Sequence, residues 1–521
     1  MPAPPLASQR LLPAEPASLR VQRRRLASAL LAVMAPMAAQ AATLVVTSPD
    51  DTDAASPATC TLRQAILSFN IGSLVGACQN SGGPFGIDDS LTFAASAISG
   101  AATPGTVTLA DSADSTGGLG GTLVISAARL TIDGSEWRGT GSGQYADGVT
   151  IARPEGAAHA FGVLRGTAPA GGLLELKGLA LRNGDALPPL CGGRREGGGV
   201  CMEAADLAMV DSRVSGNRAG YGGGGIASLG GALVLTRCTI DNNAAYLGGG
   251  VHAGSAATVS ASRITENGEW AVSHGGGIHA AGTLAVVDST ISGNTGKRGA
   301  GLQVGASASL LRSIVSSNQA YYSGGGLHVL DGAGMVLDQS TISANSARYV
   351  GGGAHAEGTL NAINTTIAGN QAAQGGGGVY LAPAATLQLD HATLASNGTG
   401  GAGGGIGGTG TGAIDRSIIA GNSAASGADI DAGVAWSGSA NLVGGGPVDL
   451  GPLQDNGGPT PTMLPGAPSA AIDAIATAAC MQAADQRGVA RPHGAGCDIG
   501  AVEVVPDRIF ADGFEAGPPP G

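Results

Sequence analysis

The sequence predicts an all-β protein folded as a single right-handed parallel β-helix, in which one chain winds through many similar coils. The motif Ser-x-Ile-x-x-Asn, followed by a loop and Gly-Gly-Gly-Ile, recurs every 24 to 27 residues. The stretches between these motifs alternate apolar and polar residues and show no helical periodicity. Glycine supplies 92 of 521 residues, whereas only 12% are charged and 3% aromatic. A repeat of about 26 residues with short strands is typical of a solenoid.

The first 41 residues have the features of an export signal. Arg23, Arg24 and Arg25 precede a short apolar stretch and the sequence Ala39-Gln40-Ala41, which has the form of a cleavage site. The apolar stretch is too short to cross a bilayer, and the sequence predicts no transmembrane helix elsewhere. We therefore expect residues 1–41 to be a signal peptide and the protein to be secreted or held at the outer cell surface.

Export makes disulfide bonds possible, and the chain has seven cysteines. Six of them form three pairs that are close in sequence: Cys60 with Cys78, Cys191 with Cys201, and Cys480 with Cys497. Cys238 is left over. No pair has the Cys-x-x-Cys spacing of a zinc site, so the sequence assigns no metal and no cofactor.

Residues 42–130 precede the regular repeats, and we expect them to cap the N-terminal end of the solenoid, because solenoids need terminal caps for solubility. This region contains Cys60-Thr-Leu-Arg-Gln-Ala-Ile66 with Asn70. The segment resembles the CSLREA segment of secreted β-helix proteins, with Thr61 and Gln64 in place of its Ser and Glu.

Residues 131–446 should form the coils, and an asparagine ends each motif. These asparagines are Asn217, Asn243, Asn267, Asn294, Asn318, Asn345, Asn370, Asn397 and Asn422. An aliphatic residue lies three positions before each one and a small residue five positions before, so both point inward from one strand face. We expect each Asn to mark a corner and to tolerate left-handed backbone there. Because coils stack about 4.8 Å apart, the amides should form an internal ladder. Cys238 falls in the small inward column and should be a buried thiol.

Two further columns are candidates for ligand binding. The first follows the aliphatic residue after each glycine triplet and contains His252, His279, His328 and His355. Because the preceding residue points inward, we expect this column to face solvent, where its members either lie within reach of a shared metal ion or ligand or form a stabilising ladder. The second is the loop between Asn and the glycines, with Tyr221, Tyr246, Trp270, Tyr321, Tyr322 and Tyr349. Its rings suit sugars or protein partners, or else cover the coil corner. The ligand-binding set is His252, His279, His328, His355, Tyr246, Trp270, Tyr321 and Tyr349.

Residues 447–505 depart from the repeat, and we expect a C-terminal cap there, followed by a flexible tail over 506–521. The motifs Asp455-Asn-Gly-Gly-Pro459, Asp485-Gln-Arg-Gly488 and Cys497-Asp-Ile-Gly-Ala-Val-Glu503 resemble the choice-of-anchor Q domain. The repeats over 212–422 are similar to those of the polymorphic outer-membrane protein family. Together these resemblances imply an exported bacterial β-helix protein, and they imply no particular reaction.

The charge balance and the missing motifs narrow the function. The net charge of −12 argues against nucleic acid and anionic lipid as partners. Solenoids of the pectin-lyase-like class include polysaccharide lyases and hydrolases, but this chain has only two lysines and lacks Asn-Thr-Asp and Gly-His-Gly motifs, so we assign no catalytic residue. The leading hypothesis is an adhesin or surface scaffold that binds a glycan or a cell-surface partner. The alternatives are a polysaccharide lyase or glycoside hydrolase, and a purely structural spacer.

Overall fold

The computed structural model describes residues 41–51, 58–99, 105–111, 121–139, 147–187, 189, 191–269, 272–444 and 448–505. The expected signal peptide, apart from Ala41, and the expected tail, residues 506–521, lie outside the described residues. Trp270, one of the candidate binding residues, also lies outside them.

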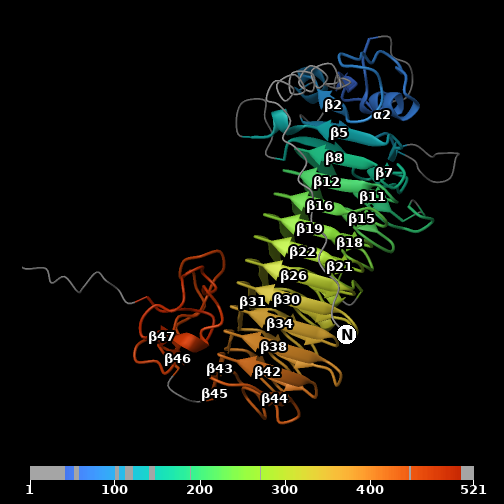
Figure 1. The fold of residues 1–521 in the computed structure, drawn as a ribbon. Coiled ribbons are helices and arrows are strands. Elements are labelled where there is room, and N and C mark those ends of the chain that lie inside the picture. The colour runs from blue at the N-terminus through green and yellow to red at the C-terminus, as the bar shows by residue number, and fades with distance from the viewer. Residues whose placement is uncertain are drawn as a thin grey trace, which may run out of the picture.

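The described chain winds into an elongated parallel β-helix with three long sheets (Figure 1). This confirms the predicted fold class. The 14-stranded sheet contains β1 (Thr43–Val46), β2 (Asp89–Phe93), β5 (Arg129–Asp133), β8 (Leu173–Lys177), β12 (Asp206–Val210), β16 (Leu233–Thr236), β19 (Ala257–Ser260), β22 (Leu284–Val287), β26 (Ser307–Leu311), β30 (Gly334–Asp338), β34 (Thr359–Ile363), β38 (Thr386–Asp390), β42 (Thr411–Asp415) and β44 (Ala435–Ser437).

The other two long sheets run beside it. The 11-stranded sheet contains β4 (Leu123–Ile125), β7 (Leu164–Gly166), β11 (Val200–Met202), β15 (Ile226–Ser228), β18 (Val251–Ala253), β21 (Ile278–Ala280), β25 (Leu302–Val304), β29 (Leu327–Val329), β33 (Ala354–Ala356), β37 (Val379–Leu381) and β41 (Ile406–Gly408). The 13-stranded sheet contains β3 (Thr106–Thr108), β6 (Val149–Ala152), β9 (Leu179–Arg182), β13 (Arg213–Ser215), β17 (Thr239–Asp241), β20 (Arg263–Thr265), β23 (Thr290–Ser292), β27 (Ile314–Ser316), β31 (Thr341–Ser343), β35 (Thr366–Ala368), β39 (Thr393–Ala395), β43 (Ile418–Ala420) and β45 (Leu442–Val443).

Short strands also pair in the loops that precede the glycine triplets. They are β10 (Asp185–Ala186) with β14 (Arg218–Ala219), and the five-stranded sheet of β24 (Thr295–Arg298), β28 (Gln319–Ser323), β32 (Ser346–Ala347), β36 (Gln371–Ala372) and β40 (Gly398–Thr399). These loops therefore stack in register along one edge of the solenoid.

One coil shows how the sequence fills the core. Leu327 and Val329 of β29, Leu337 of β30 and Ile342 of β31 are each completely buried, and their neighbours along each strand point outward. Ile342 pairs with Ile367 of the next coil, so aliphatic residues stack on aliphatic residues. Each fully buried aliphatic side chain of this size contributes about 1.5–3 kcal/mol, and the column continues through the described coils.

The corner at the asparagine differs in detail from the expectation. The left-handed residue is the one before each ladder asparagine, for example Ser317 (φ 56°) and Ala344 (φ 54°). Glycine takes this position in four repeats: Gly216, Gly293, Gly369 and Gly421. The asparagine itself is not left-handed, because its side chain must point into the core.

The N-terminal residues join the solenoid directly, since β1 pairs with β2 and β2 with β5. Helix α2 (Leu62–Ile71) packs against β1 and β4 and begins with a capping box formed by Thr61 and Gln64. The other helical segments described are α3 (Ala95–Ser99) and the 3-10 turns η1 (Ser135–Trp137) and η2 (Thr477–Ala479). No helix within the described ranges is long and apolar enough to cross a membrane.

Residues 448–505 pack on the outer face of the 13-stranded sheet, beside the last coils (Figure 1). The side-chain amide of Gln486 forms hydrogen bonds with Thr341 of β31 and Thr366 of β35. Met463 packs on Ala368 and Ala395. These contacts place the segment against the side of the sheet.

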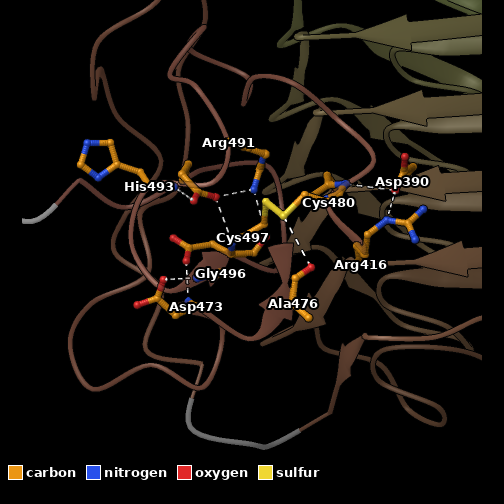
Figure 2. Close-up of a disulfide and its surroundings, with 12 residues drawn as sticks. Asp390, Arg416, Asp473, Ala476, Cys480, Arg491, His493, Gly496 and Cys497 are labelled. Atoms are coloured by element: carbon orange, nitrogen blue, oxygen red, sulfur yellow. Dashed lines mark hydrogen bonds and ion pairs between the residues drawn. A yellow bond between two sulfur atoms is a disulfide. The ribbon is translucent and has the colours of Figure 1, made fainter. Parts of the chain in front are cut away.

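A disulfide holds the docked segment together near the solenoid surface (Figure 2). Cys497 belongs to β47 (Gly496–Cys497), which pairs antiparallel with β46 (Ile475–Ala476). Asp473 accepts a hydrogen bond of 2.9 Å from the backbone N–H of Gly496. On the solenoid side, the Arg416 guanidinium donates to Asp390 over 2.7 Å, and Gln482 of the docked segment donates to the same carboxylate (Figure 2).

Candidate ligand-binding edge

The asparagine ladder sets where every edge loop begins. Each side-chain amide from Asn217 to Asn397 donates to the side-chain oxygen of the next asparagine over 2.9–3.1 Å. Asn422 ends the series by donating to Asp429. All nine asparagines are buried. Because the ladder fixes the start of each loop, the loops that follow it are presented in register.

The cysteines have the predicted pairing. The structure contains disulfides between Cys60 and Cys78, between Cys191 and Cys201, and between Cys480 and Cys497. Cys238 is a buried free thiol, and burial raises its pKa to about 11. Such a thiol is a poor nucleophile at neutral pH.

Tyrosines from successive loops stack in one column. Backbone hydrogen bonds fix the register: Leu247 N–H donates to Tyr221, His274 N–H to Tyr246, and Tyr349 N–H to Tyr322. The same register gives the full set, which we call the edge column: Arg195, Tyr221, Tyr246, Ser273, Lys297, Tyr322, Tyr349 and Gln374.

The edge column contains two pairs of neighbouring rings. Tyr322 and Tyr349 are stacked with centroids 5.3 Å apart and planes at 16°, and Tyr221 and Tyr246 lie 6.1 Å apart. Tyr246 is 41% exposed and Tyr322 38% exposed. Tyr321, a predicted binding residue, lies beside Tyr322 with its ring perpendicular to it. Partly exposed aromatic rings therefore line this edge.

Basic side chains accompany the rings. Arg194 lies over the Tyr221 ring at 5.1 Å, Lys297 over Tyr322 at 5.6 Å, and Arg348 over Tyr321 at 4.9 Å. The loops between the ladder asparagines and the glycines carry four basic residues and one acid, in a protein with net charge −12: Arg218, Lys297, Arg298 and Arg348, against Glu269. The edge is locally basic on an acidic molecule.

The histidine column lies beneath this edge, so the expectation that it faces solvent is wrong. His328 is completely buried and His252 is 8% exposed, while His279 and His355 are half-buried. The glycine turns fold back over the column: a Cβ added to Gly351 would lie only 2.9 Å from the Cβ of His355. The column points away from the core, but the returning loops cover it.

Burial changes the acid–base behaviour of these histidines. Desolvation lowers the pKa of His252 to about 4, of His279 to about 3 and of His355 to about 4. These imidazoles are therefore neutral at physiological pH. Nδ1 of His252 and Nδ1 of His279 lie 3.1 Å apart, so one donates to the other as neutral rings can.

The second histidine pair belongs to a larger polar group. His328 and His355 stack with centroids 4.8 Å apart and planes at 6°. Gln303 lies 3.1 Å from Nδ1 of His328, and Glu357 lies 3.1 Å from its Nε2. The bond from His328 holds the pKa of Glu357 down at about 2, so this carboxyl is ionised.

Three residues of this region were not predicted from the sequence. Lys297 belongs to the edge column. The residue at this position differs from coil to coil, so no repeated residue type marks it in the sequence. The ring centroids of His274 and Tyr246 lie 5.2 Å apart. The position of His274 also carries different residue types in different coils. Glu357 could have been found, because it lies two positions after His355 and so leaves the strand on the same face.

A concave polar region also lies on the 14-stranded sheet. It has a volume of about 340 Å³ and is lined in part by Asn361, Gln388, Asp390 and Arg416. Asp390 is already bonded by Arg416, His391 and Gln482, and these bonds hold its pKa well below the usual range against the opposing effect of burial. Its carboxylate is thus committed to contacts within the protein.

One comparison with known proteins supports the fold. Residues 276–445 match the family described as "Right handed beta helix region". Neither the curated proteins nor the solved structures gave a match. Together with the three long parallel sheets, the family match makes this chain a β-helix repeat protein.

Proposed function

We propose that this is a secreted or surface-held β-helix protein that binds an acidic glycan along the edge column. The observation that carries the proposal is the stacked pair of Tyr322, which is exposed, and Tyr349, which is half-buried, with Lys297 over the Tyr322 ring. A sugar ring packs its apolar face on an aromatic ring, while a nearby cation attracts the carboxylates of a uronic acid.

The spacing suits an extended polymer. Tyr221 and Tyr349 are five coils apart in the edge column, which corresponds to about 24 Å along the solenoid. Successive binding groups would then meet successive parts of one chain, and several weak contacts would add through effective concentration. The expected export of the protein, and its resemblance to surface-protein segments, support an extracellular polysaccharide as the ligand.

The test is binding of the full chain to polygalacturonate and alginate, with neutral mannan for comparison. We expect the acidic polymers to bind and the mannan not to bind, with retention falling as salt rises. The double variant Tyr322→Ala with Tyr349→Ala should weaken retention by at least about tenfold, since each stacked ring contributes about 1 kcal/mol or more.

Val336→Ala is the matched control, because Val336 is 37% exposed on the 14-stranded sheet. It should leave retention unchanged. Equal retention of the tyrosine variant and the wild type would refute the proposal. Release of shortened, unsaturated products from the polymer would instead show a lyase.

A further inference from the structure

His328, His355 and Glu357 converge from two neighbouring coils. Strands β29 and β33 pair so that His328 lies beside His355. Glu357 follows β33 on the same face as His355, and its carboxylate reaches back to Nε2 of His328 at 3.1 Å. One ligand atom from each residue lies within 4.8 Å of the other two. Nδ1 of His355 is buried and has no hydrogen-bond partner among the described residues.

We propose that these three residues bind one divalent transition-metal ion, with Zn²⁺ the best fit. Two imidazoles and one carboxylate form a common ligand set for zinc, with a water molecule as the fourth ligand. Ligand atoms of a tetrahedral zinc site lie about 3.3 Å apart. The contact between His328 and Glu357 already has this length, so a small swing of His355 completes the site.

Gln303 is placed to position His328 for the metal. Nε2 of His328 now lies against Glu357, and its Nδ1 lies 3.1 Å from the amide of Gln303. Metal binding at Nε2 moves the ring proton to Nδ1, and the Gln303 amide then turns its oxygen to accept it. A hydrogen bond of this kind to the second ring nitrogen is usual for metal-bound histidine.

The same column contains an internal comparison. His252 and His279 also stack, with centroids 5.1 Å apart, but their Nδ1 atoms bond each other. The positions that correspond to Glu357 in their coils are Gly254 and Ala281. Without a carboxylate, this pair offers only two ligands, and we expect no comparable affinity there.

The experiment is a zinc competition titration of the chelator-treated full chain at pH 7.5, using a chromophoric chelator. We expect one Zn²⁺ per chain. His355→Ala and Glu357→Gln should each lower the affinity by at least about 100-fold, and Gln303→Ala by about tenfold. The double variant His252→Ala with His279→Ala should bind as the wild type does. His355→Ala should still fold, because Ala227 and Tyr380 occupy the same column in other coils.

Circular dichroism and melting of each metal-free variant separate loss of the site from loss of the fold. Folded His355→Ala that binds zinc as tightly as the wild type would overturn the proposal. So would a wild type that takes up no zinc, or one whose zinc is lost in the His252/His279 variant. The assay needs no glycan, so its outcome is independent of the proposed glycan binding.

Discussion

The side-chain amide of Asn318 donates a hydrogen bond of 2.9 Å to the side-chain oxygen of Asn345 on the next coil. The same amide donates to the backbone oxygen of Ile291 on the preceding coil over 3.0 Å. The Asn318 oxygen accepts from both the backbone and the side chain of Asn294. A single asparagine thus joins three coils, and its loss would leave several buried polar groups without partners.

We therefore expect Asn318→Ala to lower the free energy of unfolding by about 1–3 kcal/mol. The control is Gln319→Ala, at the exposed neighbour, which should change it by less than about 0.5 kcal/mol. Denaturant unfolding of both variants gives the comparison. Equal midpoints would mean that the ladder does not stabilise the fold.

The second prediction concerns the glycine triplets, where the backbones of neighbouring coils approach each other closely. A Cβ at Gly325 would lie 2.4 Å from the backbone oxygen of Gly352 and 2.5 Å from that of Ser346. Backbone cannot move aside there without breaking the ladder, so Gly325→Ala should cost about 3 kcal/mol or more.

Gly334 is the matched glycine, because a Cβ there meets nothing within 4 Å. Gly334→Ala should be neutral or stabilise the protein by up to about 1 kcal/mol, since it restricts the unfolded chain. Thermal melting measures both changes. A similar loss of stability in both variants would show that the close approach of neighbouring coils is not what requires glycine at position 325.

The repeat allowed much of the fold to be predicted, because inward direction depends only on alternation along a strand. Val315 and Asn318 could both be placed inside from their spacing. Alternation does not reveal what covers the outer face, which is why the burial of His328 was missed. Nor does it reveal contacts distant in sequence: Gln486 meets Thr366 across 120 residues, and no local pattern indicates such a pairing.

We expect the protein to lose stability in mild acid because of its buried histidines. Burial depresses the pKa of His279 to about 3, so the folded protein stays unprotonated there while the unfolded chain takes up a proton near pH 6.5. The stability from this group is present above pH 6.5 and is lost as the pH falls towards 3. Between pH 7 and pH 5 the loss is about 2 kcal/mol for each such histidine. Asp498 acts in the opposite direction, since burial raises its pKa to about 6.

His279→Gln isolates this contribution, because Gln303 shows that the column accepts glutamine. The variant should lose about 2 kcal/mol less than the wild type between pH 7 and pH 5 in urea unfolding. His493→Gln is the control, since its ring points away from the disulfide and its neighbours in Figure 2. Parallel pH curves for wild type and His279→Gln would show that His279 does not stay neutral in the folded state.

The buried side chain of Gln486 contributes several of the hydrogen bonds that join residues 448–505 to the solenoid. The Gln486 amide nitrogen donates to the Ser340 backbone oxygen and to the Thr341 hydroxyl, and its oxygen accepts from Thr366 over 2.6 Å. Gln486→Ala should leave these groups unpaired in a buried interface and weaken docking by about 1–3 kcal/mol. Because the coils do not need this segment for their own hydrogen bonds, we expect faster proteolysis within 448–505 while residues 131–444 stay resistant.

Met481→Ala, at a side chain that is 66% exposed, should leave the cleavage rate unchanged. Cleavage of Gln486→Ala at the wild-type rate would show that the other contacts hold the segment in place without this side chain.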